Sequence, residues 1–161
     1  MADDTLPPED TAAAPTGPHA VPAVLNGNGG LKPKRVVAIG ASAGGLESLQ
    51  QLFAALPSGT GMAFVVVQHL SPDFKSLMPE LLGRQTHMPV IGVDQDQALR
   101  SNTVYVLSAG FAVELEGERL RAIPRQHDAT QNLPINRLFA SLAPLGDRAA
   151  AVRSEEHTSE L

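Results

Sequence analysis

The chain has 161 residues, among them no cysteine, no tryptophan and a single tyrosine. Without cysteine it can form no disulfide, no thiolate nucleophile and no cysteine-based zinc site. Lysine and arginine total 12 against 17 aspartates and glutamates, so the basic surface that binds nucleic acid is missing. No apolar run is long enough to span a bilayer, and the acidic start has no signal-peptide core. We therefore expect a one-domain, soluble, cytoplasmic protein with no nucleic-acid partner and no membrane insertion.

Both ends of the chain differ in composition from the middle. Residues 1–34 are rich in proline, alanine, glycine and aspartate and have no helical or strand period, which predicts a disordered tail and linker. Residues 153–161 switch abruptly to a polar, acidic composition and resemble a translated sequencing adapter, so we treat them as non-native. Residues 35–152 are left as the folded domain.

Apolar spacing within this domain predicts alternating strands and helices. Continuous apolar runs are typical of strands buried on both faces of a parallel sheet, and a helical spacing predicts the covering helices. Strands are predicted at 35–39, 62–67, 89–93, 103–107 and 149–152, a small hairpin at 111–115 and 119–123, and helices at 45–56, 74–85 and 134–142. Pro79 is expected in or near the first turn of its helix, or at a kink. The predicted class is α/β with a parallel sheet, and the hairpin is expected at the edge of the domain.

A small-residue turn follows the first predicted strand. Gly40, Ser42 and Gly44 spell G-x-S-x-G, the spacing of a nucleophile elbow, in which a sharp strand-to-helix turn lifts a serine hydroxyl clear of the backbone. Small neighbours are expected because a bulkier side chain would block the substrate carbonyl or forbid the tight backbone angles. Glycine-rich turns of this kind also open nucleotide-binding folds, and a serine here can simply cap the next helix.

A histidine, His69, follows the second predicted strand. Because the carboxyl ends of parallel strands meet at one edge of a sheet, Ser42 and His69 are expected to arrive at the same edge. Serine needs a base to become a nucleophile, and histidine is the usual one, although a histidine at a strand end can also be structural. In the α/β-hydrolases the histidine comes late in the chain. Here it follows the serine by one βαβ unit, so that fold is excluded.

These motifs together resemble the catalytic domain of CheB-type protein-glutamate methylesterases. The resemblance runs from about residue 36 to 152 and rests on Val37–Gly45, Val65–His69 and Pro134–Ala143. It implies a doubly wound parallel α/β sheet, incomplete in this chain because the late strands are missing. It also implies hydrolysis of glutamyl methyl esters on methylated chemoreceptors, with release of methanol, and glutamine deamidation in some members. The chain is similar to the methylesterase modules at the N-terminus of hybrid sensor proteins, in which methyltransferase and sensory domains follow.

The resemblance also implies a role for each matching residue. Ser42 would be the nucleophile and His69 the base, with no metal and no organic cofactor. Backbone N–H groups at the turn would stabilise the oxyanion. The residues of this oxyanion and turn region are Gly40, Ala43, Gly44 and Gly45.

Three features depart from the family's pattern. Residues 1–33 cannot form the usual receiver domain, Ala43 stands where many members have a hydroxyl residue, and the family's aspartate follows the strand that begins at Ala149, beyond this chain's last residue. In the serine-protease template, loss of the triad aspartate lowers kcat about 10⁴-fold. Asp94 and Asp96 are better explained as a solvated turn than as substitutes. We expect a fragment with little or no activity, whose open sheet edges favour aggregation.

Two other classes of function stay open. One is a non-catalytic sensory or scaffold module. The other is a nucleotide-binding domain. A nucleotide-binding domain is expected to have an acidic residue at the end of the second strand, and this chain has Gln68 and His69 there instead. The other histidines are predicted to be solvated, at the surface or in the non-native tail, and receive no role: His19, His87, His127 and His157.

Overall fold

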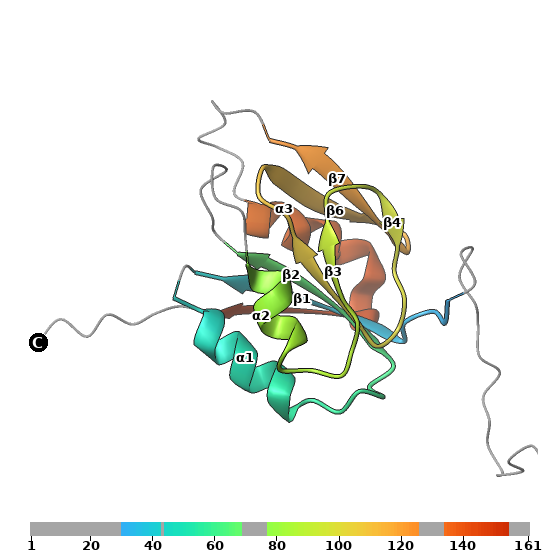
Figure 1. The fold of residues 1–161 in the computed structure, drawn as a ribbon. Coiled ribbons are helices and arrows are strands. Elements are labelled where there is room, and N and C mark those ends of the chain that lie inside the picture. Colours follow the sequence, from blue (N-terminus) through green and yellow to red (C-terminus); the bar gives the residue numbers. More distant parts are fainter. Residues whose placement is uncertain (1–29, 43, 69–76, 126–133, 155–161) are drawn as a thin grey trace, which may run out of the picture.

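The computed structural model describes residues 30–42, 44–68, 77–125 and 134–154. Its strands are β1 (Arg35–Ala41), β2 (Met62–Gln68), β3 (Val90–Val93), β4 (Gln97–Ala98), β5 (Thr103–Leu107), β6 (Phe111–Glu116), β7 (Arg119–Pro124) and β8 (Ala149–Ser154). Its helices are α1 (Leu46–Ala55), α2 (Met78–Gly83), α3 (Pro134–Ser141) and the 3₁₀ helix η1 (Ala143–Arg148). Five strands form a parallel sheet in the order β3-β5-β2-β1-β8, and three form an antiparallel sheet in the order β4-β7-β6 (Figure 1).

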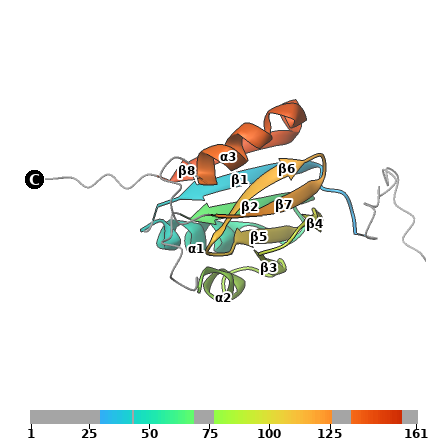
Figure 2. The same ribbon diagram turned by 90° about the horizontal axis from the view of Figure 1, so that it is seen from above.

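Side chains on both faces of the parallel sheet are buried. Along β1, Val36 and Ala38 belong to one apolar cluster, and Ile39 and Ala41 belong to the other. Successive residues of a strand point to opposite faces, so a strand covered on both sides is apolar at every position. Figure 1 shows α1 and α2 on one side of the sheet, and α3 with the small sheet on the other. Figure 2, seen from above, shows the strands of the parallel sheet side by side. The predicted doubly wound α/β class is confirmed.

The path of the chain across the sheet reverses at β1. From β1 the chain passes through α1 to β2 on one side, whereas β8, reached through α3 and η1, pairs with β1 on the other side. Phe53 of α1 belongs to one apolar cluster and Ile135 of α3 to the other, so these helices lie on opposite faces. A doubly wound sheet opens a crevice at the carboxyl ends of its strands where the order reverses. The residues directly after β1 therefore stand where such folds bind ligands.

The small antiparallel sheet lies over the parallel sheet rather than at its edge. β6 and β7 form the predicted hairpin, with Gly117 in the left-handed region at a φ of 61°. β4, which the sequence pattern did not predict, pairs with β7. Val113 and Leu120 of the hairpin join Val65 and Val67 of β2 in one apolar cluster. The apolar face of the hairpin thus covers the middle of the parallel sheet.

A side-chain hydroxyl ties α3 to this hairpin. The backbone N–H of Leu115 donates to Ser141 Oγ at 2.9 Å, and Ser141 Oγ donates to the carbonyl of Leu138 at 2.6 Å. Arg137 on the same helix forms an ion pair with Glu114 of β6. These contacts, with the buried face of α3, hold the helix across the sheet.

The second helix starts with a proline. α2 begins at Met78 with Pro79 in its first turn, as predicted, because a missing N–H there removes no helical hydrogen bond. Residues 69–76, which include the predicted start of this helix, lie outside the described residues. Within the described ranges, no helix has the length and apolar character needed to cross a bilayer.

The last strand differs from its prediction in length and in burial. β8 continues through Ser154, whereas the strand was predicted to end at Val152, and its last two residues pair with Gly40 and Ala41 of β1. Pairing between backbones needs no apolar side chain, so polar residues can extend a strand. Val152 is 47% exposed, so the prediction of a buried strand is wrong. The non-native origin of residues 153–161 stays a prediction.

Candidate active site

Three neighbouring strands end in register at the carboxyl edge of the parallel sheet. Ala41, the last residue of β1, pairs with Gln68 at the end of β2 and with Ser154 at the end of β8. Ser42 is the next residue along the chain, so it lies at this edge and at the switch point. His69 follows Gln68 in the sequence but lies outside the described residues. The expected approach of its imidazole to Ser42 therefore stays a prediction.

The turn after β1 closes through a backbone hydrogen bond. The N–H of Gly45 donates to the carbonyl of Ser42 at 3.1 Å, and α1 begins at the next residue, Leu46. Gly45 is the N-cap of α1, and no side chain hydrogen-bonds to the cap. Ser42 does not cap the helix, so the purely capping interpretation of this serine is wrong. Ala43 lies outside the described residues.

Two glycines of this segment, Gly40 and Gly45, stand where a larger side chain would have no space. Gly45 has a φ of −71°, which any residue can adopt. A Cβ on Gly45 would lie 2.7 Å from Ser154 Oγ and 3.3 Å from the carbonyl oxygen of Ser42. Gly40 lies within β1, before the turn, and a Cβ there would lie 2.5 Å from Ile135 Cγ2. Gly40 therefore lets α3 approach the sheet, and Gly45 lets the turn close against β8.

The hydroxyl oxygen of Ser42 is buried. Its Oγ has no hydrogen-bond partner in the part of the chain that the structure describes. Leaving a buried hydroxyl unsatisfied costs about 1–3 kcal/mol. Such a cost is unusual in folded proteins and is often found at functional groups. The hydroxyl thus has the character expected of a nucleophile whose proton acceptor comes from elsewhere.

A residue to which the sequence interpretation gave no role at the serine contacts this turn. Gln68 donates from Nε2 to the backbone carbonyl of Ser42 at 3.4 Å. The sequence did hold a signal for it, since Gln68 directly precedes the candidate base at the end of the strand next to β1. Ser154 is a second such residue, because its buried Oγ faces Gly45 and has no hydrogen-bond partner among the described residues.

Neither of the two aspartates considered as a substitute for the triad carboxylate, Asp94 and Asp96, is close to Ser42. Asp94 follows β3, which is separated from β1 by β5 and β2, three interstrand spacings or roughly 14 Å. Asp96 accepts a hydrogen bond from the N–H of Ala122 at 2.9 Å, so it belongs to the small sheet. Asp94 and Asp96 are both exposed, as a solvated turn predicts.

The other histidines and the acidic side chains of the described residues form no second candidate site. His87 is exposed, as predicted, while the predictions for His19, His127 and His157 fall outside the described residues. In the described ranges, no group of three or more histidine, aspartate or glutamate side chains is placed to hold a metal ion.

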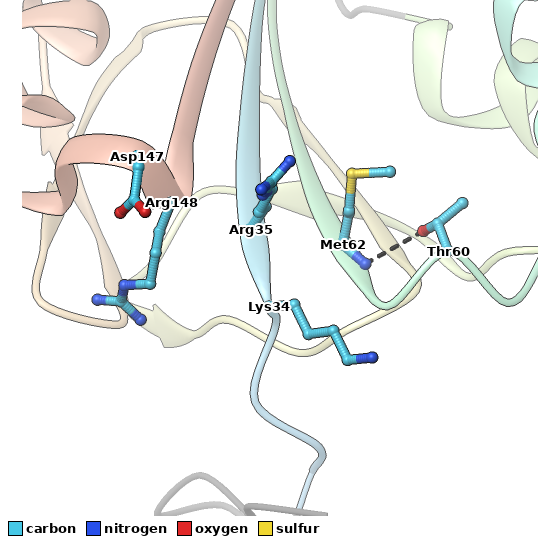
Figure 3. Close-up of a pocket in the computed structure, with 6 residues that line it drawn as sticks. All are labelled: Lys34, Arg35, Thr60, Met62, Asp147 and Arg148. Atoms are coloured by element: carbon cyan, nitrogen blue, oxygen red, sulfur yellow. Dashed lines mark hydrogen bonds between the residues drawn. The ribbon is translucent and has the colours of Figure 1, made fainter. Parts of the chain in front are cut away.

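A cavity of about 460 Å³ lies at the opposite, amino end of β1 and β2. Its lining residues are Lys34, Arg35, Thr60, Met62, Asp147 and Arg148. Figure 3 shows the charged ends of Lys34 and Arg148 pointing away from each other, so they do not converge on one ligand position. Thr60 Oγ1 accepts from the N–H of Met62 at 3.1 Å. This cavity is therefore separate from the Ser42 turn.

Comparison with known proteins decides the family. The family model for CheB methylesterase matches residues 37–152, which is most of the chain. The chain belongs to the CheB methylesterase family. The resemblance predicted from Val37–Gly45 and Val65–His69 is thereby confirmed.

Curated members of the CheB family share about a third of their residues with this chain. Protein-glutamate methylesterase/protein-glutamine glutaminase 6 of Anaeromyxobacter dehalogenans is 35% identical over 130 residues, covering 75% of this chain and 37% of the relative. Protein-glutamate methylesterase/protein-glutamine glutaminase 1 of Saccharophagus degradans is 31% identical over 121 residues, covering 73% of this chain and 33% of the relative. The chain thus spans about a third of the length of these relatives.

A solved structure of the CheB family shares the fold. The crystal structure of the Thermotoga maritima CheB methylesterase catalytic domain aligns with a TM-score of 0.61 at 21% identity, covering 74% of this chain and 66% of that one. The five-stranded parallel sheet with its small antiparallel sheet is therefore the fold of a CheB catalytic domain.

Proposed function

We propose that this chain contributes the nucleophile and base of a serine hydrolase that cleaves methyl esters of protein glutamyl side chains. The observation that carries the proposal is the buried Ser42 hydroxyl at the carboxyl edge of β1, which has no hydrogen-bond partner among the described residues. Its strand–turn–helix setting matches a nucleophile elbow. Family membership supports the substrate class, because the relatives are named as methylesterases and glutaminases.

The proposed reaction is acyl transfer to serine. His69 takes the proton of Ser42 as Oγ attacks the ester carbonyl, and backbone N–H groups at the turn stabilise the oxyanion. The tetrahedral intermediate collapses as His69 protonates the departing methoxide, which leaves as methanol. Water, deprotonated by the same imidazole, then attacks the acyl-enzyme and frees the glutamate carboxylate. With a glutamine side chain the leaving group would be ammonia. Each step uses groups of the chain and water alone.

The proposed substrate is a methylated chemoreceptor in the cytoplasm, and the role is in chemotaxis or a related signalling pathway. Fusion to methyltransferase or sensory domains in the intact protein is part of this proposal. A triad carboxylate is not among the described residues near Ser42, so we expect weak activity from this chain alone. A misplaced or missing carboxylate lowers kcat about 10⁴-fold in the serine-protease template.

Reaction with a fluorophosphonate probe tests the proposal without requiring turnover. The wild-type chain should form one covalent adduct, located at Ser42 by peptide mass spectrometry. Ser42→Ala should abolish the adduct, and His69→Gln should slow its formation. Ser58→Ala, an exposed serine after α1, is the matched control and should label like wild type. Labelling that survives Ser42→Ala, or no labelling of the wild type, contradicts the proposal and favours a non-catalytic sensory or scaffold module.

A further inference from the structure

We propose that Gln68 is a positioning residue for the nucleophile turn, holding the carbonyl of Ser42 so that the peptide after the serine faces the reacting ester. This inference rests on the proposed function. It concerns a residue that touches neither the substrate nor the reacting atoms and acts through the backbone of Ser42.

Two donors hold the Ser42 carbonyl from different directions. Gly45 donates its N–H at 3.1 Å from within the turn, and Gln68 donates Nε2 at 3.4 Å from the end of β2. Gln68 is anchored because its backbone pairs with Ala41 in the parallel ladder. The turn is therefore connected to the neighbouring strand as well as to its own helix.

Fixing this carbonyl also fixes an N–H donor. A trans peptide is planar, and its N–H points opposite to its C=O. In a nucleophile elbow, the N–H directly after the serine is one of the oxyanion donors. By holding the Ser42 carbonyl, Gln68 and Gly45 would therefore restrain the rotation of this peptide. If this peptide rotated, a carbonyl oxygen would replace the donor, and it would repel the oxyanion.

The length of the bond sets the expected size of the effect. A neutral hydrogen bond of 3.4 Å is long, so Gln68 biases the peptide orientation rather than locking it. Removing a complete oxyanion donor lowers the rate by about 10²–10³-fold. A partial loss of orientation should cost about 10- to 100-fold, below that limit.

The test measures the second-order rate of fluorophosphonate labelling at Ser42, because the phosphonate develops the same oxyanion. Gln68→Met keeps the side-chain length and removes the donor, and it should lower the rate about 10- to 100-fold. The matched control is Gln51→Met, since Gln51 Nε2 also donates at 3.4 Å, to Glu47 on exposed α1. That variant should label at the wild-type rate. An unfolding curve for each variant shows whether the fold is retained.

A second variant separates positioning from packing. Gln68→Glu has a carboxyl group that can donate when protonated and cannot when ionised. Its labelling rate relative to wild type should therefore fall as pH rises through the pKa of the carboxyl, about 4.3 in an ordinary glutamate. A new carboxylate beside the base changes the titration of that base, so each rate is first divided by that protein's own fraction of unprotonated base, fitted from its labelling–pH profile. A purely steric role would leave the resulting ratio constant.

The outcomes separate the two proposals. No labelling of the wild type contradicts the serine-hydrolase proposal itself. Labelling of wild type together with a Gln68→Met rate within twofold of it overturns the positioning role and leaves the hydrolase standing. If Gln68→Met does not fold, the ratio for Gln68→Glu decides, and a ratio independent of pH overturns the positioning role.

Discussion

Gly40 and Ile135 face each other so closely that a Cβ on the glycine would lie 2.5 Å from Ile135 Cγ2. Ile135 is buried on α3, which is held in place by its contacts with β6. We expect Gly40→Ala to lower the free energy of unfolding by about 1–3 kcal/mol through overpacking. In the double variant with Ile135→Ala, the cost should be smaller than the sum of the single changes, because the clash is gone.

Urea unfolding measures this prediction, with Gly59→Ala as its control. A Cβ on Gly59 would meet no atom within 4 Å, so that variant should stay within about 0.5 kcal/mol of wild type. If Gly40→Ala is as stable as Gly59→Ala, the close packing of α3 on β1 is contradicted.

Ser42→Ala should separate function from stability. Because Ser42 Oγ is buried and unpaired among the described residues, its removal should leave the free energy of unfolding unchanged or raise it by up to about 1 kcal/mol. Ser141→Ala is the matched comparison, since Ser141 Oγ accepts from Leu115 and donates to Leu138. That variant should lose about 1–3 kcal/mol because it leaves the N–H of Leu115 unpaired. Equal losses from both serines in chemical unfolding would argue against an unpaired Ser42.

Tyr105 is the single tyrosine of the chain, so the absorbance of tyrosinate reports on it alone. Burial raises its pKa above the usual 10.0, and its hydroxyl donates to the carbonyl of Ala98 at 3.2 Å. The folded protein should thus titrate above pH 10.0, and the chain in urea near pH 10. The neutral phenol is favoured by folding, so its contribution to stability is complete below about pH 10 and is lost as pH rises through the raised pKa. A folded-state titration at or below that of the unfolded chain would contradict this burial.

Val152 on the edge strand β8 is a site for reducing aggregation. It is 47% exposed and lies on a strand paired only with β1 in the described sheet. Unpaired apolar edges template association between chains, and a lysine on the edge opposes it. Val152→Lys should lower light scattering on concentration or warming and leave the unfolding free energy within about 0.5 kcal/mol. Glu116→Lys, a charge change on the exposed end of the small sheet, is the comparison. A similar drop in scattering there would show that net charge, not the edge, governs association.

Several parts of the fold could be predicted because they leave a local pattern. Strands buried on both faces show as continuous apolar runs, as at 62–67 and 103–107, and amphipathic spacing marks α1 and α3. β4 could not be predicted, because two residues carry no period and their pairing depends on β7. The extension of β8 through Ser154 was missed for a related reason: strand pairing is made by the backbone, while the prediction relied on side-chain polarity.

The candidate site divides in the same way. The G-x-S-x-G spacing and the strand before it located Ser42 at the carboxyl edge, since strand direction and turn residues are local properties. The contacts that hold this turn could not be predicted from the sequence. The close approach that requires Gly40 is made by Ile135, far along the chain.

The sequence by itself determined the α/β class, the order of most elements, the family and the serine, because periodicity and short motifs record which side chains are buried and where the chain turns. Tertiary structure alone decided that the hairpin covers β2, that β8 is exposed and that Gln68 holds the Ser42 carbonyl. Those facts depend on distances between residues that are remote in the chain, and such distances follow from how the helices and sheets pack against one another.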